Sequence, residues 1–441
     1  MHHSTVNGSS RLTFWSHVRE FAVPASMIES ATARRQAGDW SGACAAARVD
    51  VDINLRALSR TRGKQFADLV RTDLRHLAPD LLRWHFPRIR PDGVLRPGLT
   101  LSLARYRPPD GGDEVHLVAR TPPAWAAAGQ RISLALWERS GTLSRAGSHP
   151  HPRPDRRFRL DLHRHLWDAR RASELRERCG AAQCDPEQPD GRATHRWAAE
   201  AALLLRAEGW PGSAVVVRLT SRQQVVLDLD APGITATAPR RCTLPVLPDA
   251  ATWVPPDLEL WHAGMIAADR LHPLVRSALL PEHRPASAPG SPDSTASSRL
   301  VDCRGALHRI GVVDGVLVPL DHDPDEIRRE ELLAALGGQS LPCLHAIDTA
   351  HRHPEDLLDI RARLDHGDVA GALAVVEGLL GPDALLLSGA LRDELETAAR
   401  RKVLHGLYRA ELHDVRSLRS IEDCHRPGRR ARRRHAALRH A

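Results

Sequence analysis

Two His-x-His pairs have the spacing closest to that of metal ligands. They are His149–His151 and His163–His165, and imidazoles two residues apart on a strand share a face, where both can reach one ion. Residues 158–162 alternate between apolar and polar and predict such a strand, but His163 and His165 continue its polar, solvent-facing row. Arginines on that face would repel a cation, and the spacing supplies no third ligand. We therefore predict no metal site at either pair.

Other candidate residues also have a structural interpretation. Cys179 and Cys184 lack the closely spaced second pair of a structural zinc site. Asp321, His322 and Asp323 lie where a predicted strand meets a helix, which is a common place for acid–base residues. Asp323 is nevertheless well placed to cap that helix, and the other two are expected in the exposed turn. We predict a structural role for these five residues.

The sequence has no phosphate-binding or nucleophile motif. It contains neither G-x-x-x-x-G-K-[ST], nor G-x-G-x-x-G after a strand, nor G-x-S-x-G. Its two lysines, Lys64 and Lys402, leave little room for lysine-dependent chemistry. We predict no catalytic, cofactor-binding or metal-ligating residue and no cofactor. The alternative is an enzyme, such as a hydrolase, whose site is assembled from residues dispersed along the sequence.

The positive charge is concentrated at the C-terminal end. The chain carries a formal net charge of +8, and without the seven arginines of residues 426–441 the preceding 425 residues carry +1. A run of arginines without acids can bind nucleic-acid phosphates, with no sequence preference and with an affinity that falls as salt rises. This tail is the basis of a second alternative, a nucleic-acid-associated protein. Its candidate polyanion-binding residues are Arg429, Arg430, Arg432, Arg433 and Arg434.

The elements that would position these residues change character along the chain. Residues 1–98 contain helical patterns, including a helix over 26–37 that ends at Gly38. Residues 99–281 contain alternating runs that predict a mainly antiparallel sheet, with a helix over 196–207. The alternating runs are residues 99–103, 115–118, 132–137, 158–162, 215–219 and 225–229. We expect residues 1–98 and 99–281 to pack together as one domain.

A second domain is predicted after a linker. Residues 282–299 are rich in Pro, Ser and Ala, which predicts a flexible linker because such a segment has little to bury. Residues 310–318 then form a β-hairpin signal around Asp314-Gly315. We expect residues 300–412 to form a smaller domain of a β-hairpin and helices, and residues 413–441 to form a disordered basic tail.

One fourteen-residue segment occurs twice. Residues 33–46 and 362–375 are identical at seven of fourteen positions, among them Gly-Asp and, two residues later, Gly-Ala. Both segments resemble the turn of a tetratricopeptide-type helical hairpin, in which Gly ends one helix and Asp caps the next. A solenoid needs three or more units in tandem, and these two lie far apart. We interpret them as two ordinary helical hairpins.

These patterns together predict the fold class and a broad function. The composition, with 42% hydrophobic and 26% charged residues, excludes a disordered chain, a collagen-like fibre and a small disulfide scaffold. We predict an α+β protein that works as a binding, adaptor or regulatory protein and whose partner is another protein. The seven dispersed cysteines and the lack of a signal peptide or membrane span predict a cytoplasmic location.

Overall fold

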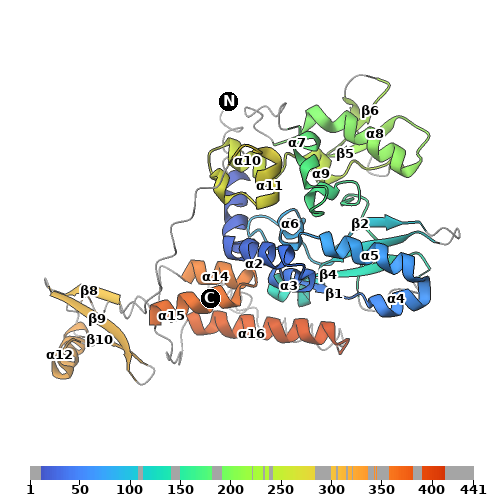
Figure 1. The fold of residues 1–441 in the computed structure, drawn as a ribbon. Coiled ribbons are helices and arrows are strands. Elements are labelled where there is room, and N and C mark those ends of the chain that lie inside the picture. Colours follow the sequence, from blue (N-terminus) through green and yellow to red (C-terminus); the bar gives the residue numbers. More distant parts are fainter. Residues whose placement is uncertain are drawn as a thin grey trace, which may run out of the picture.

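The chain has the α+β fold that the sequence predicts (Figure 1). None of the helices in the described part is long and apolar enough to cross a membrane. A computed structural model describes residues 11–107, 113–140, 149–180, 191–220, 222–231, 234–237, 242–283, 299–303, 306–313, 316–319, 321–335, 342, 344, 357–380 and 390–412.

The N-terminal part is helical, as predicted. Side-chain caps begin two of its helices: Asp39 accepts a hydrogen bond from the amide of Gly42 at 2.8 Å, and Asn54 accepts one from Ala57 at 2.9 Å. After helical residues 11–17, the elements are η1 (Val18–Ala22), α2 (Ala25–Gln36), α3 (Trp40–Ala46), α4 (Leu55–Arg62), α5 (Lys64–His76) and α6 (Pro79–Trp84).

A four-stranded mixed sheet packs beside these helices. Three of its strands are antiparallel neighbours and lie where the alternating runs predict them. The fourth strand comes from the helical segment and runs parallel to its neighbour, with Val49 opposite Ile132. The order is β1 (Val49–Val51), β4 (Ile132–Glu138), β3 (Val115–Arg120) and β2 (Thr100–Tyr106), and η2 (Ala124–Ala126) and η3 (Ala128–Gln130) precede β4.

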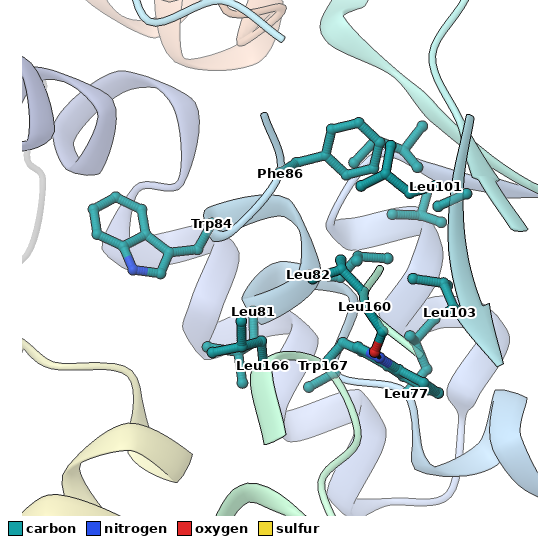
Figure 2. Close-up of a cluster of buried hydrophobic side chains, with 14 of the residues drawn as sticks. Leu77, Leu81, Leu82, Trp84, Phe86, Leu101, Leu103, Leu160, Leu166 and Trp167 are labelled. Atoms are coloured by element: carbon teal, nitrogen blue, oxygen red, sulfur yellow. Dashed lines mark hydrogen bonds between the residues drawn. The ribbon is translucent and has the colours of Figure 1, made fainter. Parts of the chain in front are cut away.

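The main hydrophobic core lies between this sheet and the helices. Figure 2 shows leucines from α6 and β2, among them Leu82 and Leu103, facing one another near Trp167. Trp167 is fully buried, and its indole nitrogen donates to the carbonyl oxygen of Leu160 at 3.0 Å. The segment 158–168 therefore closes one side of the core.

Residues 158–162 do not form the predicted strand. Arg159 makes an isolated bridge to Ser102, and the chain then turns, with the amide of Leu162 donating to the carbonyl oxygen of Arg159 at 3.2 Å. The alternation reflects this turn, in which Leu160 faces the core while Arg159 and Asp161 pair with each other, both nitrogen–oxygen distances being 2.8 Å.

The later strands form a second sheet with its own core. Its strands β5 and β6 lie at the predicted alternating runs, and Trp197, Leu204 and Val217 are buried between the sheet and α8. The single predicted sheet region thus contains two sheets. The elements here are η5 (Arg164–Leu166), η6 (Ala172–Glu174), α7 (Leu175–Arg178), η7 (Thr194–Arg196), α8 (Trp197–Glu208), β5 (Ala214–Arg218), β6 (Gln224–Asp228), β7 (Ile234–Thr237), α9 (Asp249–Thr252), α10 (Pro256–His262), η8 (Ala268–Arg270) and α11 (Pro273–Leu279).

A third sheet follows residue 298. It is an antiparallel meander in the order β8-β9-β10, in which β9 and β10 form the predicted hairpin, with Val313 opposite Val316. The turn residues 314 and 315 lie outside the described residues. The elements are β8 (Arg299–Cys303), β9 (Ala306–Val313), β10 (Val316–Pro319) and the predicted helix α12 (Pro324–Ala335).

Three C-terminal helices pack against the N-terminal part of the chain. We call α14 (Leu357–Asp365), α15 (Val369–Leu380) and α16 (Ala390–Arg409) the helical layer, and residues 11–283 the body. In the layer, α14 contacts η1 and η3, and α16 contacts η2 and η3. The domain division at 282–299 stays a prediction, because residues 284–298 lie outside the described residues.

Polar contacts fix the layer on the body. Arg48 donates to the carbonyl oxygen of His366 at 2.7 Å and to the carboxylate of Asp368 at 2.9 Å. At the other end, Arg409 donates to both carboxylate oxygens of Asp52, at 2.6 and 2.5 Å. The Arg409–Asp52 pair is bidentate and therefore directional, so it sets the orientation of the layer as well as its position.

The first of the two similar segments forms an exposed turn between α2 and α3. Gly38 has a φ of +79°, which favours glycine, and Asp39 caps α3 as described above. The guanidinium of Arg34 donates to Asp39 at 3.1 Å, and both side chains are about half exposed. No atom lies within 4 Å of the place where a side chain at Gly38 would begin.

The second segment repeats this geometry between α14 and α15. Gly367 has a φ of +77°, Asp368 accepts from the amide of Gly371 at 3.3 Å, and Arg363 donates to Asp368 at 3.4 Å. This turn, unlike the first, is covered by the body. A side chain at Gly367 would collide with the carbonyl group of Gly129. The same local structure is thus exposed in one copy and is a docking contact in the other.

The turn that contacts the body contains a buried histidine. His366 is 1% exposed, and burial lowers its pKa to about 3, with further lowering from Arg88, His17 and Arg83. The carboxylate of Asp368 is engaged by Arg48 and Arg363, and the ring of His17 lies 5.5 Å from that of His366. His366 is therefore a neutral imidazole at pH 7.

Acid is expected to loosen the helical layer through His366. In the unfolded chain this histidine takes up a proton near pH 6.5, whereas in the folded state it does so only near pH 3. The free energy of unfolding should therefore fall between these pH values, by about 2 kcal/mol from this residue at pH 5. Urea unfolding at pH 7 and pH 5 measures the effect.

The variant H366Q isolates this contribution. It should lose less stability than the parent between pH 7 and pH 5, since glutamine takes up no proton. The control H151Q changes an exposed histidine of the body and should keep the parental pH dependence. An unchanged pH dependence in H366Q would contradict the prediction.

Candidate functional site

The first predicted His-x-His pair is held by hydrogen bonds to the protein. Nε2 of His149 bonds the carbonyl oxygen of Thr121 at 2.9 Å, and its Nδ1 accepts from the amide of His151 at 3.1 Å. Both ring nitrogens of His149 are thereby engaged, which leaves neither for a metal ion. His149 has a structural role in anchoring the loop beside β3.

The second pair lies in the interior, so its predicted exposure to solvent is wrong. His163 and His165 are each 1% exposed, because the turn at residues 158–162 directs them inward. Nε2 of His163 bonds the carboxylate of Glu200 at 3.0 Å. Burial alone would raise the pKa of Glu200, but hydrogen bonds from His163 and Arg178 hold it well below its usual range. This is a buried ion-pair network.

The acid–histidine cluster before α12 has the predicted cap. Asp323 accepts a hydrogen bond from the amide of Asp325 at 2.9 Å. His322, in contrast, is not exposed as expected: its side chain is 4% exposed, and its ring lies 4.0 Å from that of His308. In the described residues, no group of three or more His, Cys, Asp or Glu side chains is placed to hold a metal ion.

Several of the candidate residues named from the sequence lie outside the described residues. Cys184 lies outside the described residues, whereas Cys179 is buried in the main core. The five candidate polyanion-binding arginines of the tail, between 429 and 434, also lie outside the described residues.

A serine–histidine pair on adjacent strands was not predicted from the sequence. Oγ of Ser102 on β2 lies 3.0 Å from Nδ1 of His116 on β3, and Nε2 of His116 lies 3.4 Å from the carboxylate of Glu114. This order of groups resembles that of a hydrolytic triad. Ser102, however, is 0% exposed, so a substrate has no access to its hydroxyl in this state.

The body also contains a large pocket that no sequence pattern predicted. It has a volume of about 660 Å³ and lies between the segment 85–96, the N-terminal helix and the segment 249–256. We call it the arginine–aromatic pocket, because six arginines and five aromatic residues line it. These are Arg11, Arg88, Arg90, Arg96, Arg157 and Arg192, with Phe14, Trp15, Phe86, Phe158 and Trp253.

Carboxylates are few on the pocket wall. Among the described lining residues, Asp249 has the one carboxylate. It forms an ion pair with Arg157, with a nearest nitrogen–oxygen distance of 2.7 Å. Arg11 is paired outside the lining with Glu259 at 2.8 Å. The pocket therefore has a net positive wall on an apolar floor that includes Leu101.

A buried histidine lies in the same wall. The side chain of His85 is 5% exposed, and its Nε2 has no hydrogen-bond partner in the described structure. The nearest carboxylate, that of Asp257, is 3.7 Å away and accepts from the indole of Trp84 at 2.7 Å. Burial lowers the pKa of His85 to about 4, so the pocket presents a neutral imidazole at pH 7.

Arg88 and Arg83 link the pocket to the helical layer. Arg88 in the pocket wall donates to the carbonyl oxygen of Arg83 at 2.7 Å. Arg83 is fully buried, and its guanidinium donates to the carbonyl oxygen of His366 in the layer at 3.4 Å. Two residues thus connect a pocket wall to the turn that fixes the layer on the body.

Comparison of the chain with protein-family models, with curated proteins and with solved structures gave no match. Evidence for a function therefore comes from the geometry of the pocket and of its link to the helical layer.

Proposed function

We propose that the protein is a regulatory binding protein, in which a small molecule in the arginine–aromatic pocket controls how the helical layer sits on the body. The observation that carries this proposal is the link from Arg88 through Arg83 to His366. A ligand that contacts Arg88 changes the environment of the segment 85–96. Arg83, whose carbonyl oxygen accepts from Arg88, is fully buried, so a shift of Arg88 is transmitted as a change of packing.

In this proposal, the position of the helical layer controls the binding of another protein. The layer exposes apolar side chains that a partner could cover, and Leu358 and Val403 are 72% and 63% exposed. The proposed location is the cytoplasm, and the free thiols of Cys44 and Cys242 are consistent with a reducing compartment.

A thiol label in the pocket tests the coupling without a known ligand. Ala250 lines the pocket, and A250C modified with N-phenylmaleimide would place a planar group there. We expect slower amide hydrogen exchange in α14 and α15 after modification, because a filled pocket restrains segment 85–96.

The controls separate this effect from labelling elsewhere. The modified parent chain accounts for the native cysteines, and modified R56C carries the label at an exposed position of α4. Neither should slow exchange in the layer. Equal exchange in modified and unmodified A250C would refute the proposed coupling.

An esterase or related hydrolase is the second candidate function, and the cluster Ser102–His116–Glu114 is the observation that favours it. Because Ser102 is fully buried, we expect a fluorophosphonate probe to leave it unmodified in the folded protein. Mass spectrometry of the treated protein measures this. Modification that is lost in S102A but retained in S59A, a serine of α4, would instead support the hydrolase.

A further inference from the structure

The wall of the arginine–aromatic pocket is built from stacked pairs. The guanidinium carbon of Arg90 lies 5.0 Å from the ring centre of Phe14, and that of Arg157 lies 5.0 Å from the ring centre of Phe158. Arg11 lies over Trp253 at the same distance. Guanidinium and aromatic groups are both planar, so such pairs hold each other in place and offer flat surfaces to a ligand.

Three guanidinium groups of the pocket have no carboxylate partner among the described residues. In the described structure, none of Arg88, Arg90 and Arg96 forms an ion pair with an Asp or Glu side chain. Arg88 donates to two backbone carbonyl oxygens, those of Gly93 at 2.8 Å and Arg83 at 2.7 Å. Burial lowers its pKa to about 9, so it is charged at pH 7. An anion in the pocket would compensate this buried charge.

The floor of the pocket is apolar, in contrast to its positively charged wall. Phe86, Leu101, Leu160 and Leu166 line it, and all four are buried in the main core. An inorganic anion alone would leave this surface and most of the volume of about 660 Å³ unfilled. A neutral apolar molecule would leave the arginines uncompensated.

We propose that the pocket binds a planar aromatic organic anion. Its carboxylate or phosphate group is held by Arg88, Arg90 and Arg96, and its ring lies against the aromatic wall. His85 also lines the pocket, and its neutral ring adds no charge to that of the arginines. This inference rests on the proposed function, for which it names the class of ligand.

Four probe molecules test the two halves of this ligand class. They are 2-naphthyl phosphate, 2-naphthoate, 2-naphthol and inorganic phosphate, titrated into the full chain by calorimetry. We expect at least one naphthyl anion to bind about ten-fold or more tightly than both 2-naphthol and inorganic phosphate, because it alone satisfies both surfaces. The comparison of the two anions shows whether the site takes a phosphate or a carboxylate.

Variants locate the binding. Arg90 and Arg96 are exposed residues at the pocket edge, so R90Q and R96Q should fold and should each weaken binding of the naphthyl anion about ten-fold. R56Q on α4 is the matched control and should bind like the parent. Parental affinity in both pocket variants would place the anion elsewhere and overturn the inference.

The outcomes distinguish this inference from the proposed function. Binding of 2-naphthol as tight as that of the anions would overturn the ligand class, and so would an absence of binding by all four probes. Neither result changes the hydrogen exchange of modified A250C, which uses no ligand. That measurement alone decides whether the pocket is coupled to the helical layer.

Discussion

Replacement of Gly367 by alanine is expected to detach the helical layer from the body. The residue has a φ of +77°, and an added methyl group would collide with the carbonyl group of Gly129. The positive φ costs about 1–2 kcal/mol for a residue with a side chain, and overpacking adds about 1–3 kcal/mol. We expect a loss of about 2–5 kcal/mol in the free energy of unfolding, measured in urea, and faster hydrogen exchange in α14 to α16.

The repeated segment supplies a matched control. Gly38 has the same conformation, with a φ of +79°, but no atom lies within 4 Å of an added methyl group. G38A should therefore lose only the conformational contribution, about 1–2 kcal/mol, and leave exchange in the helical layer unchanged. Equal losses in G38A and G367A would show that the contact with Gly129 does not hold the layer.

Replacement of Arg83 by methionine should have a similarly large effect. This guanidinium is fully buried and donates to the carbonyl oxygens of three separate segments, at Ala22, Gln130 and His366. Methionine keeps much of the volume but leaves these acceptors without a donor, and each such loss costs about 1–3 kcal/mol. We expect R83M to lose about 3–5 kcal/mol in the free energy of unfolding.

Two further variants test the reason for that loss. R83K keeps the charge, but an ammonium group cannot span three acceptors in the geometry of a guanidinium, so it should recover little of the stability. R56M removes an exposed arginine from α4 and should change stability by less than about 0.5 kcal/mol. A loss below about 1 kcal/mol in R83M would contradict the role given to Arg83.

Local patterns predicted the elements better than their arrangement. The alternating runs around Leu117 and Leu134 predicted β3 and β4, although all the residues of β3 are buried. The same pattern at residues 158–162 was misleading, since a turn can also place Leu160 inside and its neighbours outside. The strand predicted there also placed His163 in solvent, whereas this side chain is buried.

The pocket could not be predicted in the same way. Arg88 and Arg90 are close in the sequence between Pro87 and Pro91, which indicates an extended segment. Arg11 and Arg157, however, reach the pocket from segments far away in the chain. Sequence spacing carries no information about such convergence, and arginine is too common in this chain for a single one to stand out. The partner of Ser102 was hidden for the same reason, because it lies on another strand.

The position of the helical layer has a consequence for synthesis. Arg48 and Asp52 precede their partners in the layer by 320 and 357 residues, so a ribosome needs roughly 15 s to about a minute to make the intervening chain. During that interval the helical layer does not yet cover the body of the nascent chain. The surface awaiting the layer contains Arg48, Asp52 and the carbonyl group of Ala126, which water can solvate. Because these groups stay hydrated on the nascent body, the polar part of the docking surface can wait for the last helices without exposing apolar side chains.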